Sequence, residues 1–236
     1  DMDSSEAARV FLAENTLLHM NMLEILRRGS GDILYAGPDG VLLRDRQSGA
    51  YFMASAGAES DGRLLDLLPG DTGLFVGHHL RYKGEAARRF RLREEQICYQ
   101  AAWMRPELPV VPEISGVLRL LDRSHAAYVY EHYSHPFGGV AYVEKVIERG
   151  MVGAFVDGVL AGFAGFHDEG SIGLLEVLPE YRRRGLGEAL LCAAVRLALE
   201  RGQYAFGQVF TDNRPSLALQ RKVGMTVSED ILYWLF

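Results

Sequence analysis

Cysteine is scarce in this sequence, with only Cys98 and Cys192 among 236 residues. The two lie far apart and outside any C-x-x-C pattern, so neither a disulfide framework nor a zinc site is indicated. Because cysteine is among the residues most often buried, we expect both thiols to lie in the core. No metal site is expected elsewhere, because the two histidine pairs, His78 with His79 and His132 with His135, have no third ligand near them in the sequence.

Long apolar runs and net positive charge are also missing. No apolar stretch approaches the roughly 18 residues of a membrane-spanning helix, and no basic-then-apolar signal sequence is present, so a cytoplasmic protein without membrane contact is expected. The net charge of −6 argues against a general nucleic-acid-binding protein. With 48% hydrophobic residues, the chain is long enough for one large or two modest domains.

Prolines mark the best candidate for a linker. Three of them, Pro106, Pro109 and Pro112, fall within the segment "MRPELPVVPE" and prevent regular helices or strands there. This predicts an N-terminal domain over residues 1–105, a linker over 106–112 and a C-terminal domain over 113–236. In the first domain we expect helices near 4–28, 62–68 and 79–89, with strands near 32–36, 41–44, 50–54, 73–77 and 96–103.

The second domain has a clearer order of elements. Strands are expected over 114–121, 171–178, 204–210 and 226–236, with a hairpin over 151–166 that turns at Asp157 and Gly158. Helices are expected over 124–133, 140–149, 187–201 and 215–222. The order β-α-α-β-β-β-α-β-α-β predicts an α/β fold around a mixed, mostly antiparallel sheet, and not the regular alternation of a doubly wound fold.

The stretch "EVLPEYRRRGLGEALL", residues 176–191, combines three arginines with two glycines immediately before a predicted helix. The first turn of a helix has unpaired N–H donors and a partial positive charge, and glycine lets a ligand approach the backbone. The pattern therefore indicates an anion site, with phosphate as its natural ligand. It matches neither the P-loop pattern nor G-x-G-x-x-G.

Two segments together resemble a known family. "VLPEYRRRGLGEALL" is similar to the cofactor signature [R/Q]-x-x-G-x-[G/A] of the GNAT N-acetyltransferase superfamily, with Arg182, Gly185 and Gly187 in the motif positions. "VFTDNRPSLALQRKVGM" resembles the second block of that family, with its Asn213, Ser216, Leu219 and Gly224 at the expected spacing. The resemblance covers about residues 112–236 and looks most like the glycine N-acyltransferase-like branch. The first half has the element mix of a degenerate copy of the same fold.

The resemblance implies the GNAT acyl-CoA N-acyltransferase fold and transfer of an acetyl group from acetyl-CoA, or of another short acyl group, to a primary amine. Backbone groups of Leu175, Glu176 and Val177 would hold the pantetheine arm and polarise the thioester. Amides of residues 183–188 would bind the pyrophosphate, and Asn213 would contact the cofactor. The cofactor-binding residues implied in this way are Leu175, Glu176, Val177, Arg182, Arg183, Arg184, Gly185, Leu186, Gly187, Glu188, Asn213 and Ser216.

The chain departs from the family at both familiar catalytic positions. The tyrosine that many members have seven residues after the asparagine is Gln220 here, and the glutamate that one branch has five residues before it is Gln208. An amide cannot transfer a proton. Three interpretations remain open: the CoA thiolate leaves without an acid, another side chain serves, or the protein binds acyl-CoA without turnover. Glu176 is the preferred base, directly or through a water, and the other side chains considered are His167, Asp168 and Tyr233.

The acceptor side is expected on the helices over 124–149, where Tyr128, Tyr130 and Tyr133 are candidates for lining a pocket. The leading interpretation is an N-acetyltransferase acting on a small amine or an amino acid. The alternatives are a protein N-acetyltransferase and a non-catalytic acyl-CoA sensor. The sequence determines neither the acceptor, nor the acyl length, nor whether the protein is a monomer or a homodimer.

Overall fold

The structure is a computed structural model that describes residues 2–134 and 138–236. The chain forms two compact units. The first runs to Ala101 and includes Gln208–Arg214 and Val227–Phe236, and the second comprises Ala102–Gly207 and Pro215–Thr226. The last strand of the chain therefore belongs, by its contacts, to the unit that contains the N-terminal half. The domain limits inferred from the sequence stay a prediction.

The first unit is built on strands in the order β1-β2-β3-β4-β11-β5. The strands are β1 (Gly31–Gly37), β2 (Gly40–Asp45), β3 (Tyr51–Ser55), β4 (Phe75–Gly77), β5 (Glu95–Ala102) and β11 (Thr226–Leu235). The helices are α1 (Ser4–Leu12), α2 (Met20–Arg27), α3 (Ala58–Leu65) and α4 (Lys83–Phe90). The helix-rich start expected over 4–28 consists of α1, a 3-10 turn at Ala13–Asn15 and α2, and α3 begins four residues before the expected Gly62.

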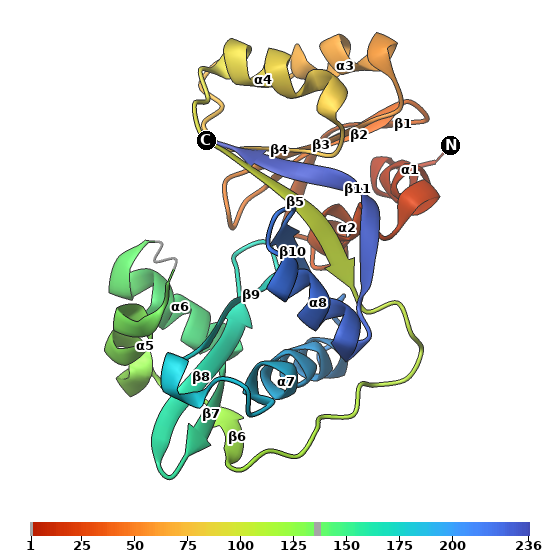
Figure 1. The fold of residues 1–236 in the computed structure, drawn as a ribbon. Coiled ribbons are helices and arrows are strands. Elements are labelled where there is room, and N and C mark those ends of the chain that lie inside the picture. Colours follow the sequence, from red (N-terminus) through yellow and green to blue (C-terminus); the bar gives the residue numbers. More distant parts are fainter. Residues whose placement is uncertain (1, 135–137) are drawn as a thin grey trace. The chain divides into compact units, whose positions relative to one another are not determined.

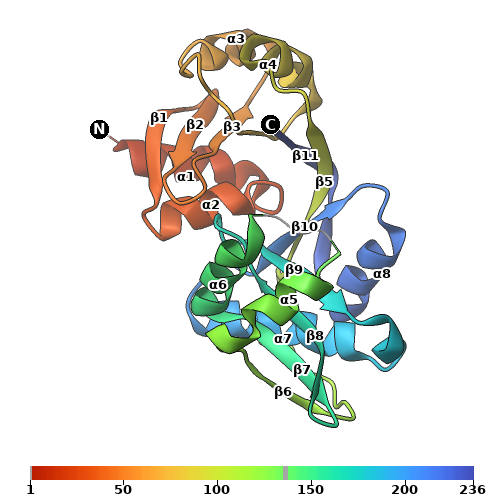
Figure 2. The same cartoon turned by 90° about the vertical axis from the view of Figure 1, so that its left-hand side faces the viewer.

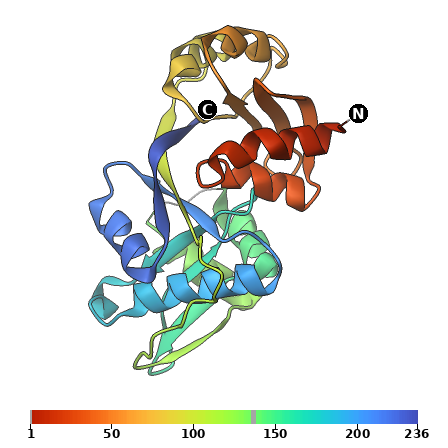
Figure 3. The same cartoon turned by 90° about the vertical axis from the view of Figure 1, so that its right-hand side faces the viewer.

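Alternating strand residues give this unit a core on each face of its sheet. Val41 and Leu43 of β2 pack with residues of α1 and α2, whereas Leu42 packs on the other face with residues of α3 and α4. Figure 3 shows α1 and α2 lying along one face of β1, β2 and β3. The two-residue alternation of buried side chains therefore places a pair of helices on each face.

The second unit follows the predicted order of elements. Its strands are β6 (Val117–Leu120), β7 (Val152–Val156), β8 (Val159–Phe166), β9 (Ile172–Val177) and the start of β10 (Phe206–Phe210), in the sheet order β10-β9-β8-β7-β6. The helices are α5 (Ala126–His132), α6 (Gly139–Gly150), α7 (Leu186–Glu200) and α8 (Arg214–Val223). The expected turn joins β7 to β8, with Asp157 and Gly158 both at positive φ, as a two-residue hairpin loop requires.

Helices cover both faces of this second sheet. Val129 of α5 and Val143 and Val146 of α6 form one core with Phe163 of β8 and Leu174 of β9. On the opposite face α7 packs against β7, β8 and β9, as Figures 1 and 2 show. The mixed sheet flanked by helices confirms the predicted fold class.

Both cysteines are free and buried, as predicted. Burial raises the pKa of the Cys98 thiol to about 12, so that this side chain behaves as a small apolar residue at neutral pH. Among the described residues, no helix is both long enough and apolar enough to span a bilayer.

A buried histidine lies in the core of the first unit. The Nδ1 atom of His78 lies 2.8 Å from the carbonyl oxygen of Met53, and its Nε2 atom lies 3.0 Å from the side-chain amide of Asn21. Burial, and secondarily the neighbouring His19, lowers the pKa of His78 from 6.5 to about 3. The His78 ring is therefore neutral in the folded protein and takes up its proton only on unfolding.

Acidification is accordingly expected to destabilise the first unit. Because the unfolded state binds the His78 proton below pH 6.5 and the folded state does not, the unfolding free energy falls as pH decreases. Between pH 7 and pH 5 the His78 contribution to this fall is about 2 kcal/mol. Urea unfolding at both pH values should show a smaller fall for His78→Gln than for the parent chain. An equal fall in both proteins would contradict the assignment.

Candidate functional site

The connection from β9 to α7 forms the strand, turn and helix that the sequence predicts. After Val177 the chain makes a 3-10 turn over Pro179–Tyr181, and α7 begins at Leu186 with Gly185 as its N-cap residue. No side chain caps this helix. The carbonyl of Gly185 accepts the first intrahelical bond from the N–H of Ala189 at 3.1 Å. The N–H groups of residues 186–188 therefore precede the helical hydrogen bonds and face a ligand position.

The turn before α7 is tightly wound. Arg183 has φ 65° and Gly185 has φ 77°, both in the left-handed region. A non-glycine residue in that region is uncommon and marks a backbone whose shape is determined by its surroundings. Successive turned residues direct their N–H groups inward, a geometry that binds anions.

The side chains of two of the three arginines are engaged by the loop itself. Arg182 donates from Nε to the carbonyl oxygen of Val177 at 3.0 Å. The guanidinium of Arg184 lies over the ring of Tyr181, 5.3 Å from its centroid. These contacts favour an anion site made of backbone N–H groups, with the arginine side chains in a supporting position.

Strand β9 carries a bulge just before the residues that the family pattern assigns to the thioester. Its register with β8 pairs Glu176 with Phe163 and Gly173 with Gly165, so that Leu174 and Leu175 lie opposite the single residue Ala164. Leu174 has φ 49°. A bulge of this kind bends the strand and leaves backbone groups unpaired.

The other edge of β9 is held only at its start. Among the residues that the structure describes, β9 and β10 share one register pair, Gly207 with Ile172. Backbone groups of Leu175, Glu176 and Val177 therefore lie beyond this pair. They remain candidates for holding a pantetheine arm, as the sequence predicts.

The carboxylate of Glu176 is engaged by neighbouring side chains. Ser134, just after α5, donates from its hydroxyl to Oε1 at 2.6 Å, and Nη2 of Arg182 lies 3.7 Å from the same oxygen. The Glu176 side chain is 11% exposed. Its position on β9 fits the predicted role at the thioester, but its oxygens already have a donor and a cation.

The three predicted acceptor-side tyrosines differ in their surroundings. The hydroxyl of Tyr128 donates to the carbonyl of Leu160 at 2.9 Å, so it is used within the fold. Tyr130 is exposed. Tyr133 packs edge-on against Phe163, and burial, with a smaller contribution from the charge of Glu176, raises its pKa to about 12. Tyr133 is thus the member of the set that lies next to Glu176.

Helix α8 lies against the start of α7. Lys222 and Glu188 form an ion pair at 3.1 Å, and a Cβ atom at Gly187 would lie 3.7 Å from Leu219. Gln220 is 7% exposed, and its Oε1 atom is buried without a hydrogen-bond partner among the described residues. Ser216, like Gln220, is on α8, so the α8 part of the second sequence block lies beside the start of α7.

Three candidate residues belong to the first unit. The N–H of Asn213 donates to the carbonyl of Phe210 at 2.9 Å. Gln208 accepts from Nε1 of Trp234 at 2.8 Å. Tyr233 is fully buried and donates to the carbonyl of His79 at 2.7 Å. Burial raises the pKa of Tyr233 above its usual range, so Tyr233 lacks the properties of a general acid.

The remaining candidates, His167 and Asp168, follow β8. Nδ1 of His167 lies 2.7 Å from the hydroxyl of Tyr142 on α6, and Asp168 pairs with Arg149 at 2.6 Å. Sequence reasoning considered His167 but missed Tyr142, Ser134 and Arg149. No local pattern identifies these partners, because each reaches its contact from a helix or loop distant in the sequence.

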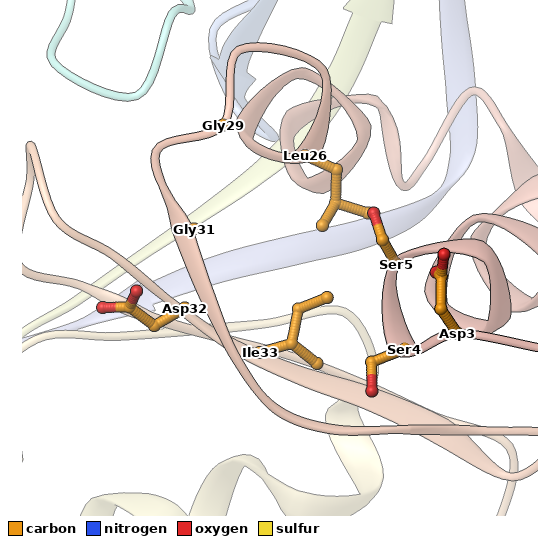
Figure 4. Close-up of a pocket in the computed structure, with 8 residues that line it drawn as sticks. All are labelled: Asp3, Ser4, Ser5, Leu26, Gly29, Gly31, Asp32 and Ile33. Atoms are coloured by element: carbon orange, nitrogen blue, oxygen red, sulfur yellow. The ribbon is translucent and has the colours of Figure 1, made fainter.

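An open pocket in the first unit is lined by the start of α1, the end of α2 and β1 (Figure 4). Its lining includes two carboxylates, Asp3 and Asp32, and no lysine or arginine. This lining does not suit a phosphate group, and none of the candidate residues named above contributes to it. Within the described residues, no three His, Cys, Asp or Glu side chains form a group that could hold a metal ion; His135 lies outside those residues.

Comparison with known proteins identifies the family of this chain. The family model for the acetyltransferase (GNAT) family matches residues 93–225, more than half of the chain. The chain therefore belongs to the GNAT acetyltransferase family, whose members generally use acetyl-CoA.

Individual relatives are distant. A Bacillus subtilis (strain 168) protein described as a putative ribosomal protein bS18-alanine N-acetyltransferase is 31% identical over 119 residues, 46% of this chain and 77% of that protein. A Drosophila protein structure aligns with a TM-score of 0.69 at 16% identity, over 99% of this chain and 96% of its own. A Sphaerobacter thermophilus GCN5-related N-acetyltransferase aligns with a TM-score of 0.55 at 16% identity, over 99% and 93%. At these identities the structures support the fold alone.

The two motif glycines should respond differently to alanine. Gly185 has φ 77°, and a left-handed conformation costs a non-glycine residue about 1–2 kcal/mol. A Cβ at Gly187 would make only ordinary contacts, 3.7 Å from Leu219 and 3.8 Å from Val177, and alanine favours a helix by about 0.5–1 kcal/mol over glycine. In urea unfolding, Gly185→Ala should therefore lower the unfolding free energy and Gly187→Ala should not. Equal losses would mean that the fold itself requires a glycine at both positions.

Proposed function

We propose that this protein is an N-acetyltransferase that moves an acetyl group from acetyl-CoA to the primary amine of a small molecule or an amino acid. The observation that carries the proposal is the uncapped first turn of α7 behind the left-handed turn at Arg183 and Gly185. Membership of the GNAT family supports it. The glycine N-acyltransferase-like branch remains a prediction from the motif "GQVFTDNRPSLALQRKVGM".

The residues present suit the pyrophosphate of CoA. The N–H groups of residues 186–188 have no intrahelical partner, and Gly187 adds no side chain to this first turn. In the proposal, amides of Arg183 to Glu188 bind the pyrophosphate, and Ser216 adds a contact from α8; the contact of Asn213 stays a prediction from the family resemblance. Backbone groups of β9 beyond its bulge hold the pantetheine arm and polarise the thioester carbonyl.

The reaction needs little covalent chemistry from the protein. A neutral amine attacks the thioester carbonyl directly once both are held in contact. The site must hold the amine, take up its proton and stabilise the leaving thiolate. Gln220 occupies the place of the usual acid and cannot give a proton, so we infer that the thiolate leaves with hydrogen-bond stabilisation and receives its proton from another group.

The first unit, in this proposal, is a degenerate copy of the same fold. Its order α1-α2-β1-β2-β3-α3-β4-α4-β5 repeats the order of the second unit from α5 onward. Its parallel strands β3 and β4 share three consecutive pairs, Tyr51–Phe75, Phe52–Val76 and Met53–Gly77. The first turn of α3 carries Glu59 and Asp61, whose charge opposes a phosphate. We therefore propose the pyrophosphate site at the start of α7, in the second unit, and none at the start of α3.

A protein N-acetyltransferase is the second candidate. The Bacillus subtilis relative, described as acting on an alanine of a ribosomal protein, favours it. A non-catalytic acyl-CoA sensor is the third, because both familiar catalytic positions, Gln208 and Gln220, are amides. The three candidates share the CoA-binding loop and differ in acceptor and turnover.

The CoA loop can be tested by binding alone. Gly187→Leu places a side chain where the pyrophosphate would lie, so CoA binding measured by calorimetry should fall below detection. Arg184→Ala removes one exposed charge, worth about 1 kcal/mol or less, so the Kd should rise by at most about fivefold. Gly84→Leu on α4, where a Cβ meets nothing within 4 Å, is the matched control and should leave the Kd unchanged. The reverse order of effects at Gly187 and Arg184 would contradict the loop assignment.

The acceptor class can be tested by a screen with acetyl-CoA that follows release of free CoA thiol. Small amines and amino acids form one arm, and peptides with an N-terminal alanine form the other. Turnover in the first arm is expected. Turnover confined to peptides would favour the protein N-acetyltransferase, and CoA binding without turnover in either arm would favour the sensor.

A further inference from the structure

His167 is held in a defined orientation at the end of β8. Its Nδ1 atom lies 2.7 Å from the hydroxyl of Tyr142 on α6, and the two rings stack at an interplanar angle of 27°. Its backbone N–H donates to the carbonyl of Ser171 at 2.8 Å, which closes the hairpin into β9. Both the position and the rotation of the ring are therefore determined.

The imidazole lies directly against β9. A Cβ atom at Gly173 would overlap Nε2 of His167, so the ring occupies the space that a side chain on that residue would fill. Gly173 immediately precedes Leu174, the residue of the bulge with φ 49°. Because residues in a strand advance by about 3.3 Å each, Nε2 lies within roughly 7 Å, along the strand, of the Leu175 backbone.

Nε2 of His167 is available for a ligand, in contrast to Glu176. Among the described residues Nε2 has no hydrogen-bond partner, whereas Glu176 accepts from Ser134 and lies near Arg182. His167 and Glu176 share the face of the sheet that α5 and α6 cover, since Tyr142 and Ser134 reach them from that side. The His167 ring thus lies against Gly173 of β9, and Glu176 is three residues further along the same strand.

The His167 ring is neutral at neutral pH, despite the charged groups around it. Tyr142 and Arg149 face it from α6, Asp168 and Glu169 come from its own hairpin, and the adjoining part of β9 is uncharged. Burial outweighs the two carboxylates and lowers the pKa of His167 below 6.5. Burial also raises the pKa of Tyr142 above its usual range, so that its hydroxyl stays protonated.

We propose that His167 is the general base for the acceptor amine and that Tyr142 is the positioning residue that holds it. This rests on the proposed N-acetyltransferase function and replaces Glu176 as the preferred base. Glu176 then keeps a structural role, joining Ser134 to the motif arginine Arg182.

The proposed reaction needs no reactant besides the amine, acetyl-CoA and the His167 side chain. The amine nitrogen forms a bond to the acetyl carbonyl carbon and the carbon–sulfur bond breaks, so that CoA leaves as thiolate. The proton lost by the nitrogen goes to Nε2 of His167, and the imidazolium donates from Nδ1 to the Tyr142 oxygen. The Nε2 proton then passes to the thiolate, which restores neutral His167.

The tautomer of His167 can be measured by NMR and tests the proposed role of this residue without an activity assay. For Nε2 to accept a proton, the neutral ring must carry its hydrogen on Nδ1 and donate it to Tyr142. Nitrogen NMR of the imidazoles, assigned with His167→Gln, should show a protonated Nδ1 and an unprotonated Nε2, with a titration midpoint below 6.5. Tyr142→Phe should shift the ring toward the other tautomer. A protonated Nε2 in the parent chain would overturn the proposal.

Kinetics provide the second test. The acid limb of the kcat/KM profile should report the His167 titration measured by NMR. His167→Gln should lower kcat by about 100-fold to 10,000-fold and remove that limb, with the Kd for CoA unchanged. Gly173→Ala should reduce kcat in the same direction by displacing the ring, and Glu176→Gln should keep the acid limb. An acid limb that persists in His167→Gln and disappears in Glu176→Gln would return the role to Glu176.

Failure of the inference is distinguishable from failure of the proposed function. Absence of turnover by the parent chain on every amine and peptide would overturn both. Turnover with an intact acid limb in His167→Gln, or with a protonated Nε2 in the parent chain, would overturn only the assignment of His167.

Discussion

The first turn of α7 leaves backbone N–H groups without intrahelical partners, and no side chain caps them. Such groups are normally satisfied by a cap, by water or by a ligand. Arg183 and Gly185, just before this turn, have left-handed conformations, and Lys222 of α8 forms an ion pair with Glu188 in it. The candidate anion site is thus made of main-chain groups, and the side chains of Arg182 and Arg184 bind back onto the β9–α7 connection.

Local signals in the sequence account for what could be predicted. The Asp157-Gly158 turn, the start of α7 after two glycines and the end of α8 before Gly224 each depend on backbone preferences of a few adjacent residues. The order of elements in the second unit follows from these signals and was predicted in full. The helix-rich start over 4–28 was predicted as a region, but its division into α1 and α2 was not, because the apolar periodicity continues across Thr16–His19, where the chain turns.

Features that depend on pairing between distant segments could not be predicted. The bulge at Leu174 is defined by the pairing of β9 with β8. Nothing in the local sequence "SIGLLEV" indicates it. The contacts of Glu176 with Ser134 and of His167 with Tyr142 join residues 42 and 25 positions apart. The burial of Tyr233, which was considered as a catalytic side chain, likewise depends on packing against the distant residues Phe75 and Tyr82.

The division of roles along β9 follows from what already surrounds each group. The carboxylate of Glu176 accepts a hydrogen bond from the Ser134 hydroxyl and lies near the guanidinium of Arg182, so it already supports the motif arginine. The imidazole of His167 has one nitrogen bound to Tyr142 and the other without a partner among the described residues. Gly173 is the residue that admits the imidazole to this position, because a Cβ there would overlap Nε2 of His167. In the proposed mechanism, Gly173 thus lets the proton acceptor approach the backbone of β9, and Gly187, at the start of α7, lets the pyrophosphate approach the backbone of the helix.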